Sequence, residues 1–294
     1  MITIKNNEQI SKMREAGALL YEVLQRLCEV VHPGMNTMEL DVYAERLIRH
    51  HHAVPSFLGY EGFPASLCTS PDDMVVHGIP SDGMVLREGM ILSMDCGLVL
   101  DGWQADSAIT VPVGEVSAEA KRLIALTERC FFEGARHAAV GQRLGDIGYA
   151  VSELAEQNGL GVVRDLSGHG IGREMHEDPA VFNYGRPGHG VRLQAGMTLA
   201  IEPMITLGTW RVETDDDGWG IRTADHSLCS HYEHTVVINP DGLPEVLTLP
   251  GFSWSAYDKG LAEGADLSDK RAKLSGSGAV SASMEAAVPG RGGE

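Results

Sequence analysis

The chain has 294 residues, 43% of them hydrophobic and 22% charged, a composition typical of a globular protein rather than a fibrous or disordered one. Its formal net charge of −18 argues against nucleic acid or an anionic membrane as a partner, since both attract clustered Lys and Arg. Five widely spaced cysteines with no Cys-x-x-Cys pair argue against a disulfide framework and a thiolate zinc site. Residues 1–10 lack the apolar run of a signal peptide, and no stretch has the about 18 apolar residues that a membrane span needs. We therefore expect a cytoplasmic protein.

The first part of the chain reads as two helices followed by strands. Apolar residues recur at helical spacing over residues 7–29, and Pro33-Gly34 breaks this helix. A second helix is expected over Thr37–His50, with Thr37 as its cap. Residues 53–116 are then expected to form strands and turns.

A hairpin is the clearest feature of this region. The apolar runs Met90–Leu100 and Ala105–Val113 lie on either side of Asp101-Gly102. Asp-Gly between two apolar runs is a strong signal for a two-residue hairpin turn. We therefore expect these two runs to pair as antiparallel strands.

The same order of elements then returns. Helical spacing recurs at Ala118–Ala139 and Leu144–Gln157, and strand-like runs follow Gly161. The chain is thus expected to contain two helices followed by a set of strands, and then the same order of elements again.

Two shifts of the sequence support a duplication. A shift of 107 residues pairs Asp95 with Glu202 at the end of a ten-residue window that contains four identities. A shift of 127 residues pairs Asp106 with Glu233, again an acid ahead of an apolar strand. Both matches end on carboxylates and keep the same chain order, so we predict similar halves, about 1–116 and 117–252, around a pseudo-twofold axis.

The composition changes near the end of the chain. Residues 268–294 are rich in Ser, Gly, Ala and Lys/Arg and have almost no large apolar side chain. Such a segment buries too little apolar surface to order itself. We expect a catalytic domain over 1–252 and a disordered C-terminal tail over 253–294.

Asp95 and Asp106 are the first candidate ligands for a metal. In the expected hairpin Asp106 lies opposite Gly97, and Asp95 shares a strand face with Gly97. The two carboxylates are therefore diagonal neighbours, with Cα atoms about 7–8 Å apart. Carboxylates on a buried strand face are costly unless a cation compensates them.

Three further residues complete the candidate set. Glu202 and Glu233 each interrupt an apolar run in the second half, and His169 lies in Gly168-His169-Gly170-Ile171-Gly172, where the glycines are expected to allow a tight turn. Four carboxylates and one imidazole favour Mn, Fe(II), Co or Zn in a dinuclear site. Two ions about 3.5–4 Å apart activate a bridging water and clamp a hydrolysed bond. The sequence therefore predicts a metal-dependent hydrolase, with its substrate left open.

A series of short motifs follows in order along the chain. The motifs are Val75-Val76-His77-Gly78-Ile79-Pro80, Asp95, Asp106-Ser107, Gly168-His169-Gly170-Ile171-Gly172-Arg173, His176-Glu177-Asp178-Pro179, Ile201-Glu202-Pro203-Met204 and Tyr232-Glu233-His234-Thr235. Together they resemble the type I methionine aminopeptidases, and the likeness extends from Ile4 to about Leu249. The resemblance implies the pita-bread fold, an α/β (α+β) architecture in which two pseudo-symmetric halves pack helices outside a curved, largely antiparallel sheet. It also implies removal of the initiator Met from nascent polypeptides near the ribosome, with a small second residue preferred, by a monomer.

The resemblance also assigns roles to residues. Its motifs imply two metal ions bound by Asp95, Asp106, His169, Glu202 and Glu233. His77 and His176 are implied to contact the substrate near the scissile amide and its carbonyl, and Glu202 to move the proton. The methionine pocket is implied to consist of Tyr60, Phe63, Cys68, Met175 and Trp219. The chain departs from the common pattern of this family at two places. Met175 stands where the family frequently has an aromatic residue, and Gln104-Ala105 stand where it commonly has His-Gly.

Relatives of the same fold are the alternatives. Proline-specific aminopeptidase P and prolidase generally carry an extra domain ahead of the metal half, whereas the family-like residues here begin at about Ile4. Non-catalytic binding modules have lost ligands, whereas all five positions are filled here. A type II enzyme needs an insert of tens of residues between the His169 and Glu233 motifs, which only 63 residues separate here.

Overall fold

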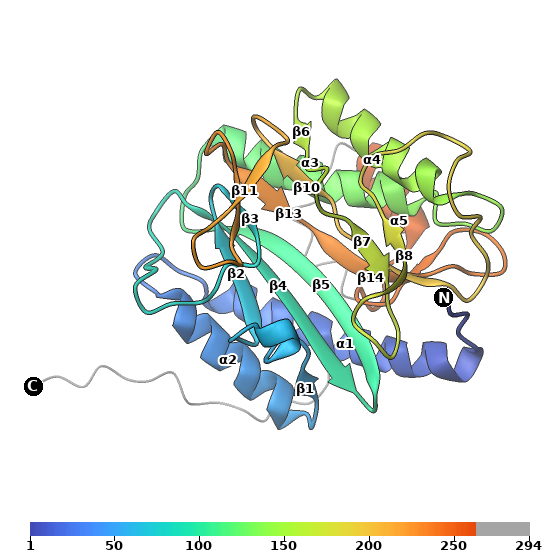
Figure 1. Cartoon of the computed structure of the whole chain (residues 1–294), viewed down its shortest axis with the longest axis horizontal. Helices are drawn as coiled ribbons and strands as arrows, with labels where there is room; N and C mark the ends of the chain where they lie inside the picture. Colours follow the sequence, from blue (N-terminus) through green and yellow to red (C-terminus); the bar gives the residue numbers. More distant parts are fainter. Residues whose placement is uncertain (263–294) are drawn as a thin grey trace, which may run out of the picture. The chain divides into compact units, whose positions relative to one another are not determined.

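The computed structural model describes residues 1–262 (Figure 1). The chain divides into one compact unit, Met1–Pro250, and a second unit that begins at Gly251. Within the second unit Trp254–Ala262 form helix α5, where the rings of Phe252, Trp254 and Tyr257 contact one another. This stretch therefore differs from the disordered tail that we expected over 253–294, because three aromatic side chains give it apolar contacts. The remainder of that region, residues 263–294, lies outside the described residues.

A nine-stranded sheet forms the centre of the first unit. Its main path runs β1-β4-β5-β14-β9-β7-β8, while β2 pairs with β4 and β15 with β14, all antiparallel. The strands are β1 (Val54–Pro55), β2 (Leu67–Pro71), β4 (Ile91–Leu100), β5 (Trp103–Pro112), β7 (Gly168–Gly170), β8 (Glu177–Val181), β9 (Thr198–Ile201), β14 (Glu233–Val237) and β15 (Glu245–Val246). The inner four strands have the order β4-β5-β14-β9, so the two predicted halves contribute one adjacent pair each. The pseudo-twofold axis between the halves stays a prediction.

Two small antiparallel sheets accompany the large one. The first contains β6 (Gly161–Val162), β10 (Met204–Thr206) and β13 (Cys229–His231). The second contains β3 (Met74–Val76), β11 (Val212–Thr214) and β12 (Ile221–Thr223). A 3₁₀ turn, η1 (Tyr60–Gly62), lies between β1 and β2. The fold is therefore a mixed α/β structure with antiparallel sheets, as expected.

The predicted hairpin is present with the predicted register. Gly97 pairs with Asp106 and Leu100 with Trp103 across β4 and β5. Asp101 and Gly102 form the turn with φ angles of 50° and 77°. Positive φ at both positions matches a turn that continues the right-handed twist of the strands, which is why Asp-Gly suits it.

The helices of the first half are α1 (Asn7–Val30) and α2 (Thr37–His50). Helix α2 has the predicted bounds and α1 ends one residue later than predicted, but the cap of α2 differs from the prediction. Asn36 is the cap, and its side chain accepts from the backbone amide at position 39. Thr37 is instead buried in the first turn, where its hydroxyl exchanges hydrogen bonds with the backbone of Ser81.

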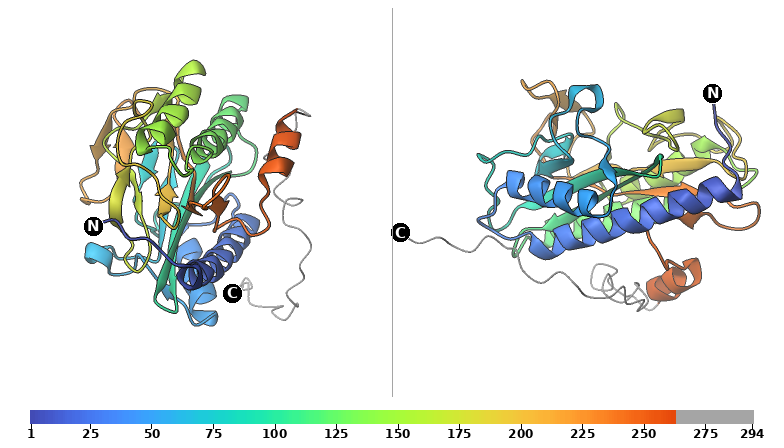
Figure 2. Two further views of the ribbon diagram at one scale, coloured as in Figure 1. Left: turned by 90° about the vertical axis from the view of Figure 1, so that its right-hand side faces the viewer. Right: turned by 90° about the horizontal axis from the view of Figure 1, so that it is seen from below.

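The helices of the second half are α3 (Ala118–Ala135) and α4 (Leu144–Gln157). The first is shorter than the Ala118–Ala139 expected. After Ala135 the amides of residues 137 and 138 bond to carbonyls three residues back, and this tighter turn ends the helix. Helices α1 and α3 lie on the same side of the large sheet (Figure 2). None of the helices within residues 1–262 has both the length and the apolarity that a membrane span requires.

Candidate metal centre

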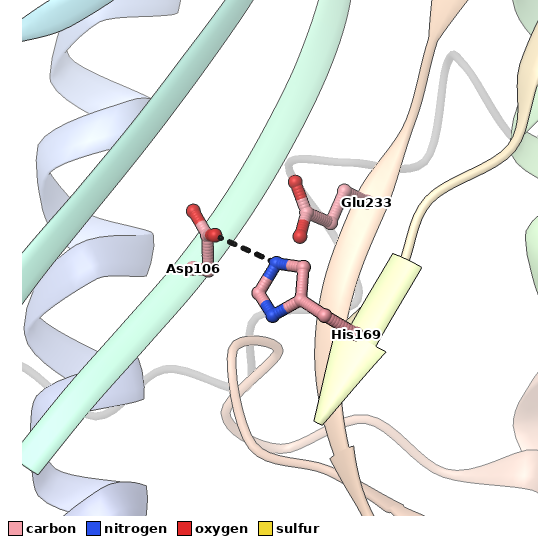
Figure 3. Close-up of side chains that lie close together, drawn as sticks. All are labelled: Asp106, His169 and Glu233. Carbon is pink, nitrogen blue, oxygen red and sulfur yellow. Dashed lines mark ion pairs between the residues drawn. The ribbon is translucent and has the colours of Figure 1, made fainter. Parts of the chain in front are cut away.

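Five neighbouring strands of the large sheet supply the five predicted ligands. Asp95 lies on β4, Asp106 on β5, Glu233 on β14 and His169 on β7, and Glu202 directly follows β9. These strands are consecutive in the order β4-β5-β14-β9-β7. Figure 3 shows Asp106, His169 and Glu233 pointing toward one another from three of them. Residues up to 138 positions apart in the sequence therefore share one site.

The ligand atoms lie at distances that suit a shared ion. The Nε2 atom of His169 is 3.5 Å from Asp106 Oδ2 and 3.8 Å from Glu202 Oε1. One ligand atom each from Asp106, His169 and Glu233 lie within 4.8 Å of one another. Ligands about 2.0–2.2 Å from one ion are separated by roughly 3–4 Å, so a modest contraction of this group would enclose a cation.

His169 is held as a ligand by the strand that carries it. Its Nδ1 lies 2.9 Å from the carbonyl oxygen of Gly170, which places the ring proton on Nδ1 and leaves the lone pair of Nε2 for a metal. The flanking glycines do not form the expected tight turn, because both lie in β7. A Cβ at Gly168 would instead collide with the carbonyl of Ala200, and one at Gly170 with that of Asp178. The glycines are needed because neighbouring backbones approach closely.

The electrostatics of the site require a positive charge. Asp95 Oδ1, Asp106 Oδ1 and Glu233 Oε1 are buried and accept no hydrogen bond from the described residues. Burial, and then the charges of the neighbouring acids, raise the pKa of Asp95, Glu202 and Glu233 well above their ordinary values. Clustered buried carboxylates are stable when cations coordinate their free oxygens. The oxygen-rich donor set therefore fits divalent metal ions.

Two histidines border this set, as expected. The rings of His176 and His169 lie 4.4 Å apart, and His176 Nδ1 is 2.8 Å from the hydroxyl of Tyr60. His77 follows β3 with a left-handed φ of 59°. Burial lowers the pKa of both His77 and His176, although the nearby charge of Asp106 opposes the shift. Each is thus a neutral imidazole beside the carboxylates at neutral pH.

The predicted methionine pocket forms two adjoining groups of side chains. Phe63 and Trp219 are in edge contact at 5.2 Å between ring centres, and Cys68 packs with them. Met175 and Tyr60 belong to a second group around Trp103. Sequence reasoning missed Phe57, which packs against both groups and lies beside Met175 above Gly97. No local pattern distinguishes Phe57 from an ordinary core residue.

His231 was also missed as a site residue. Its Nε2 lies 3.6 Å from Glu202 Oε2 and 3.8 Å from Glu233 Oε2, and the three form a second possible metal-binding group. Burial, and then the charge of His77, lowers its pKa to about 3. The sequence holds only a partial signal: His231 stands two residues before Glu233, but the two residues lie on different strands, β13 and β14.

Comparison with known proteins agrees with this geometry. Residues 11–240 match the sequence model of metallopeptidase family M24. A methionine aminopeptidase of Clostridium acetobutylicum is 52% identical over 249 residues, which cover 85% of this chain and 99% of that protein. The crystal structure of methionine aminopeptidase from Rickettsia prowazekii superposes with a TM-score of 0.83 at 41% identity, over 85% of this chain and 100% of that one.

Proline-specific enzymes are more distant. A prolidase of Pyrococcus furiosus has a TM-score of 0.65 at 21% identity, over 83% of this chain and 65% of that one. This likeness extends to the fold alone.

Proposed function

The chain belongs to metallopeptidase family M24, and we propose that it hydrolyses the peptide bond after an N-terminal methionine. The observation that carries the proposal is the convergence of Asp106, His169, Glu202 and Glu233, with Asp95 beside them, from consecutive strands. Relatives named methionine aminopeptidase, 52% and 53% identical over most of the chain, supply the substrate. The proline-specific alternative is supported by fold alone.

We propose that these five residues hold two divalent ions, drawn from Mn, Co, Fe(II) and Zn. When two metal ions are bound, they supply Lewis-acid polarisation of the scissile carbonyl and lower the pKa of the attacking water. His169 offers Nε2, and the carboxylates offer the oxygens that no described residue hydrogen-bonds. All five residues are hard or borderline ligands, so they suit each of these metals and do not distinguish between them.

Glu202 is the proposed proton carrier. It stands at the end of β9 with its backbone carbonyl held by the Asn183 side chain at 2.9 Å. Burial and the charges of Asp95 and Asp106 raise its pKa, so it takes up a proton more readily than an ordinary carboxylate. The carboxylate accepts a proton from the attacking water and returns it to the leaving amine, as a C–O bond forms and the C–N bond breaks.

His77 and His176 are the proposed hydrogen-bond donors to the substrate. Tyr60 fixes one ring nitrogen of His176, whose ring packs on His169. A neutral imidazole with one nitrogen so fixed can point the other at the carbonyl oxygen on which negative charge develops. The methionine side chain is placed against Phe63, Cys68 and Trp219, with Tyr60 and Met175 on the adjoining side. Thioether sulfur packs well against aromatic rings.

The setting of the reaction is part of the proposal. The substrate is a nascent polypeptide near the ribosome, with a small second residue because the site close to the carboxylates crowds a bulky one. We propose a monomer in the cytoplasm. Support comes from the five cysteines, all of them free thiols, which suit a reducing compartment.

A peptide series tests the proposed function. Met-Ala, Met-Gly, Met-Leu and Leu-Ala peptides are incubated with the Mn(II)-loaded or Co(II)-loaded protein, and released amino acid is measured. We expect fast release from Met-Ala and Met-Gly and slow release from Met-Leu and Leu-Ala. Equal rates for Leu-Ala and Met-Ala would refute methionine specificity. Cleavage of Xaa-Pro peptides instead would establish the proline-specific alternative.

A further inference from the structure

His231 is a buried imidazole in the site that the mechanism above does not use. Its side chain is 2% exposed, and its Nε2 has no hydrogen-bond partner among the described residues. The nearest oxygens belong to two proposed metal ligands, Glu202 Oε2 at 3.6 Å and Glu233 Oε2 at 3.8 Å. A shift of roughly half an ångström would bring the first of these to hydrogen-bond distance.

The backbone holds His231 at this place independently of its side chain. The hydroxyl of Thr110 on β5 accepts from the amide of His231 at 3.0 Å and donates to its carbonyl at 2.8 Å. His231 also pairs with Met204, two residues after Glu202. The amide of Tyr232 then donates to the carbonyl of Pro203 at 3.2 Å. The segments that carry His231 and Glu202 are therefore tied together directly.

Glu202 lies between two imidazoles and turns a different oxygen to each. Its Oε1 faces His169 and its Oε2 faces His231. The Gly170 carbonyl fixes the proton of His169 on Nδ1, so that Nε2 is a lone-pair donor to a metal. The Nε2 of His231, in contrast, has no hydrogen-bond partner among the described residues and can carry the proton. The two rings thus suit opposite roles: His169 binds the ion and His231 donates a hydrogen bond.

We propose that His231 is a positioning residue for Glu202, donating its Nε2–H to Glu202 Oε2, so that Oε1, which faces His169, would be left to hold an ion. The inference rests on the proposed function, since it deepens the role of Glu202. A carboxylate held at both oxygens cannot rotate away from the water that it deprotonates. Such partners of metal ligands typically change activity by about 10–100-fold.

Two isosteric substitutions test the role of the donor. Gln at position 231 keeps an N–H donor of similar reach, whereas Met fills the same space without one. We expect H231M to lower kcat for Met-Ala peptide by about 10–100-fold with KM nearly unchanged, and H231Q to restore it to within a few-fold. Both should still bind two Mn(II) ions by calorimetry. Ser230→Ala is the matched control, because Ser230 precedes His231 on β13 and projects to the other face.

Other outcomes would overturn the inference. Unchanged kcat in H231M would show that the hydrogen bond does nothing. Loss of one of the two Mn(II) ions in both variants would show that His231 is a ligand. A ¹H–¹⁵N spectrum of the Zn(II)-loaded protein, with the His231 signal identified by its loss in H231Q, gives a readout without turnover. A proton bonded to Nε2 is expected, and an unprotonated Nε2 refutes the proposal even if the wild-type protein cleaves no methionine peptide.

Discussion

Lys5 and Glu177 form a buried ion pair, with Nζ 2.6 Å from Oε2 and side chains 4% and 10% exposed. Glu177 directly follows His176, so the pair ties the N-terminal segment to a proposed substrate-contacting residue. Gly172 makes room for the pair, because a Cβ at this position would collide with Glu177 Oε1 and Lys5 Cε. The last glycine of the Gly168–Gly172 motif is therefore explained by an ion pair at the border of the site.

Replacing Lys5 by Met should destabilise the fold. Burial alone would raise the pKa of Glu177, but hydrogen bonds from Lys5 and Thr3 outweigh it and hold the pKa below its ordinary value. Without Lys5 the buried carboxylate keeps the hydrogen bonds from Thr3 and from the amide of Arg173 but has no ion-pair partner, which costs about 3 kcal/mol, or about 8 °C in Tm for a domain of this size. Thermal unfolding followed by circular dichroism measures the shift.

The control for this variant is Lys12→Met. Lys12 pairs with Glu8 at 3.4 Å on the surface of α1, with side chains 42% and 80% exposed. Such a pair contributes less than about 1 kcal/mol. Equal Tm shifts in the two variants would contradict the buried-pair account.

The stabilising contribution of Glu177 depends on pH. Because the folded pKa of Glu177 lies below the unfolded value of 4.5, its contribution to the stability of the wild-type protein is present above that pH and is lost as the pH falls through the folded pKa.

Asp106→Asn should separate metal binding from folding. The amide keeps the shape of Asp106 but removes the charge that the ions need. We expect the rate on Met-Ala peptide to fall by more than about 100-fold, since even the hydrogen-bond partners of ligands cost 10–100-fold. Metal-free Tm should not fall, because one of several repelling charges is gone. Asp101→Asn, an exposed change at the hairpin turn where Asn tolerates the positive φ, is the control. Intact turnover in Asp106→Asn would refute the metal site.

Removal of metal should destabilise the protein more strongly as the pH rises. Burial and neighbouring acids raise the folded pKa of Asp95, Glu202 and Glu233 above their unfolded values of 3.8 and 4.5. In metal-free protein their contribution to stability is complete below those unfolded values and is lost as the pH rises through the folded ones. Bound ions need the ionised ligands and so gain affinity over the same range. The Tm difference between Mn(II)-loaded and EDTA-treated protein should widen as the pH rises above the unfolded pKa values. A Tm difference that does not change with pH would contradict the proposed repulsion among the buried carboxylates.

The carboxylates of the site were predictable because the hairpin fixes their geometry. Asp101-Gly102 determines the register, and the register makes Asp95 and Asp106 diagonal neighbours. The pairing of β14 with β5 and β9 brings Glu233 and Glu202 beside them, and only the predicted duplication pointed to this from the sequence. The register of the hairpin was therefore predictable from local turn chemistry, whereas the pairing across the two halves depended on internal similarity.

Long-range contacts account for what was missed. The place of His231 depends on Thr110 and on pairing with Met204, neither of which a local pattern records. The cap of α2 shows a local ambiguity, since Asn36 and Thr37 are both good caps. Thr37 became helical because its hydroxyl bonds to Ser81, more than 40 residues away. Local preference ranks Asn above Thr as a cap, and the tertiary contacts of Thr37 favour the same choice.

Phe63 and Trp219 provide the last prediction, on recognition of the methionine side chain. Phe63 is buried, and the centre of its ring lies 5.2 Å from that of Trp219, an edge contact that would fix the walls of the proposed methionine pocket. Phe63→Ala should raise KM for Met-Ala about tenfold while kcat changes less than about threefold, since apolar contacts bind substrate and transition state alike. The preference for Met-Ala over Leu-Ala should narrow, because the pocket no longer discriminates shape. Tyr149→Ala, an exposed aromatic on α4, is the control. If kcat falls and KM does not change, Phe63 orders the metal site and does not contact the substrate.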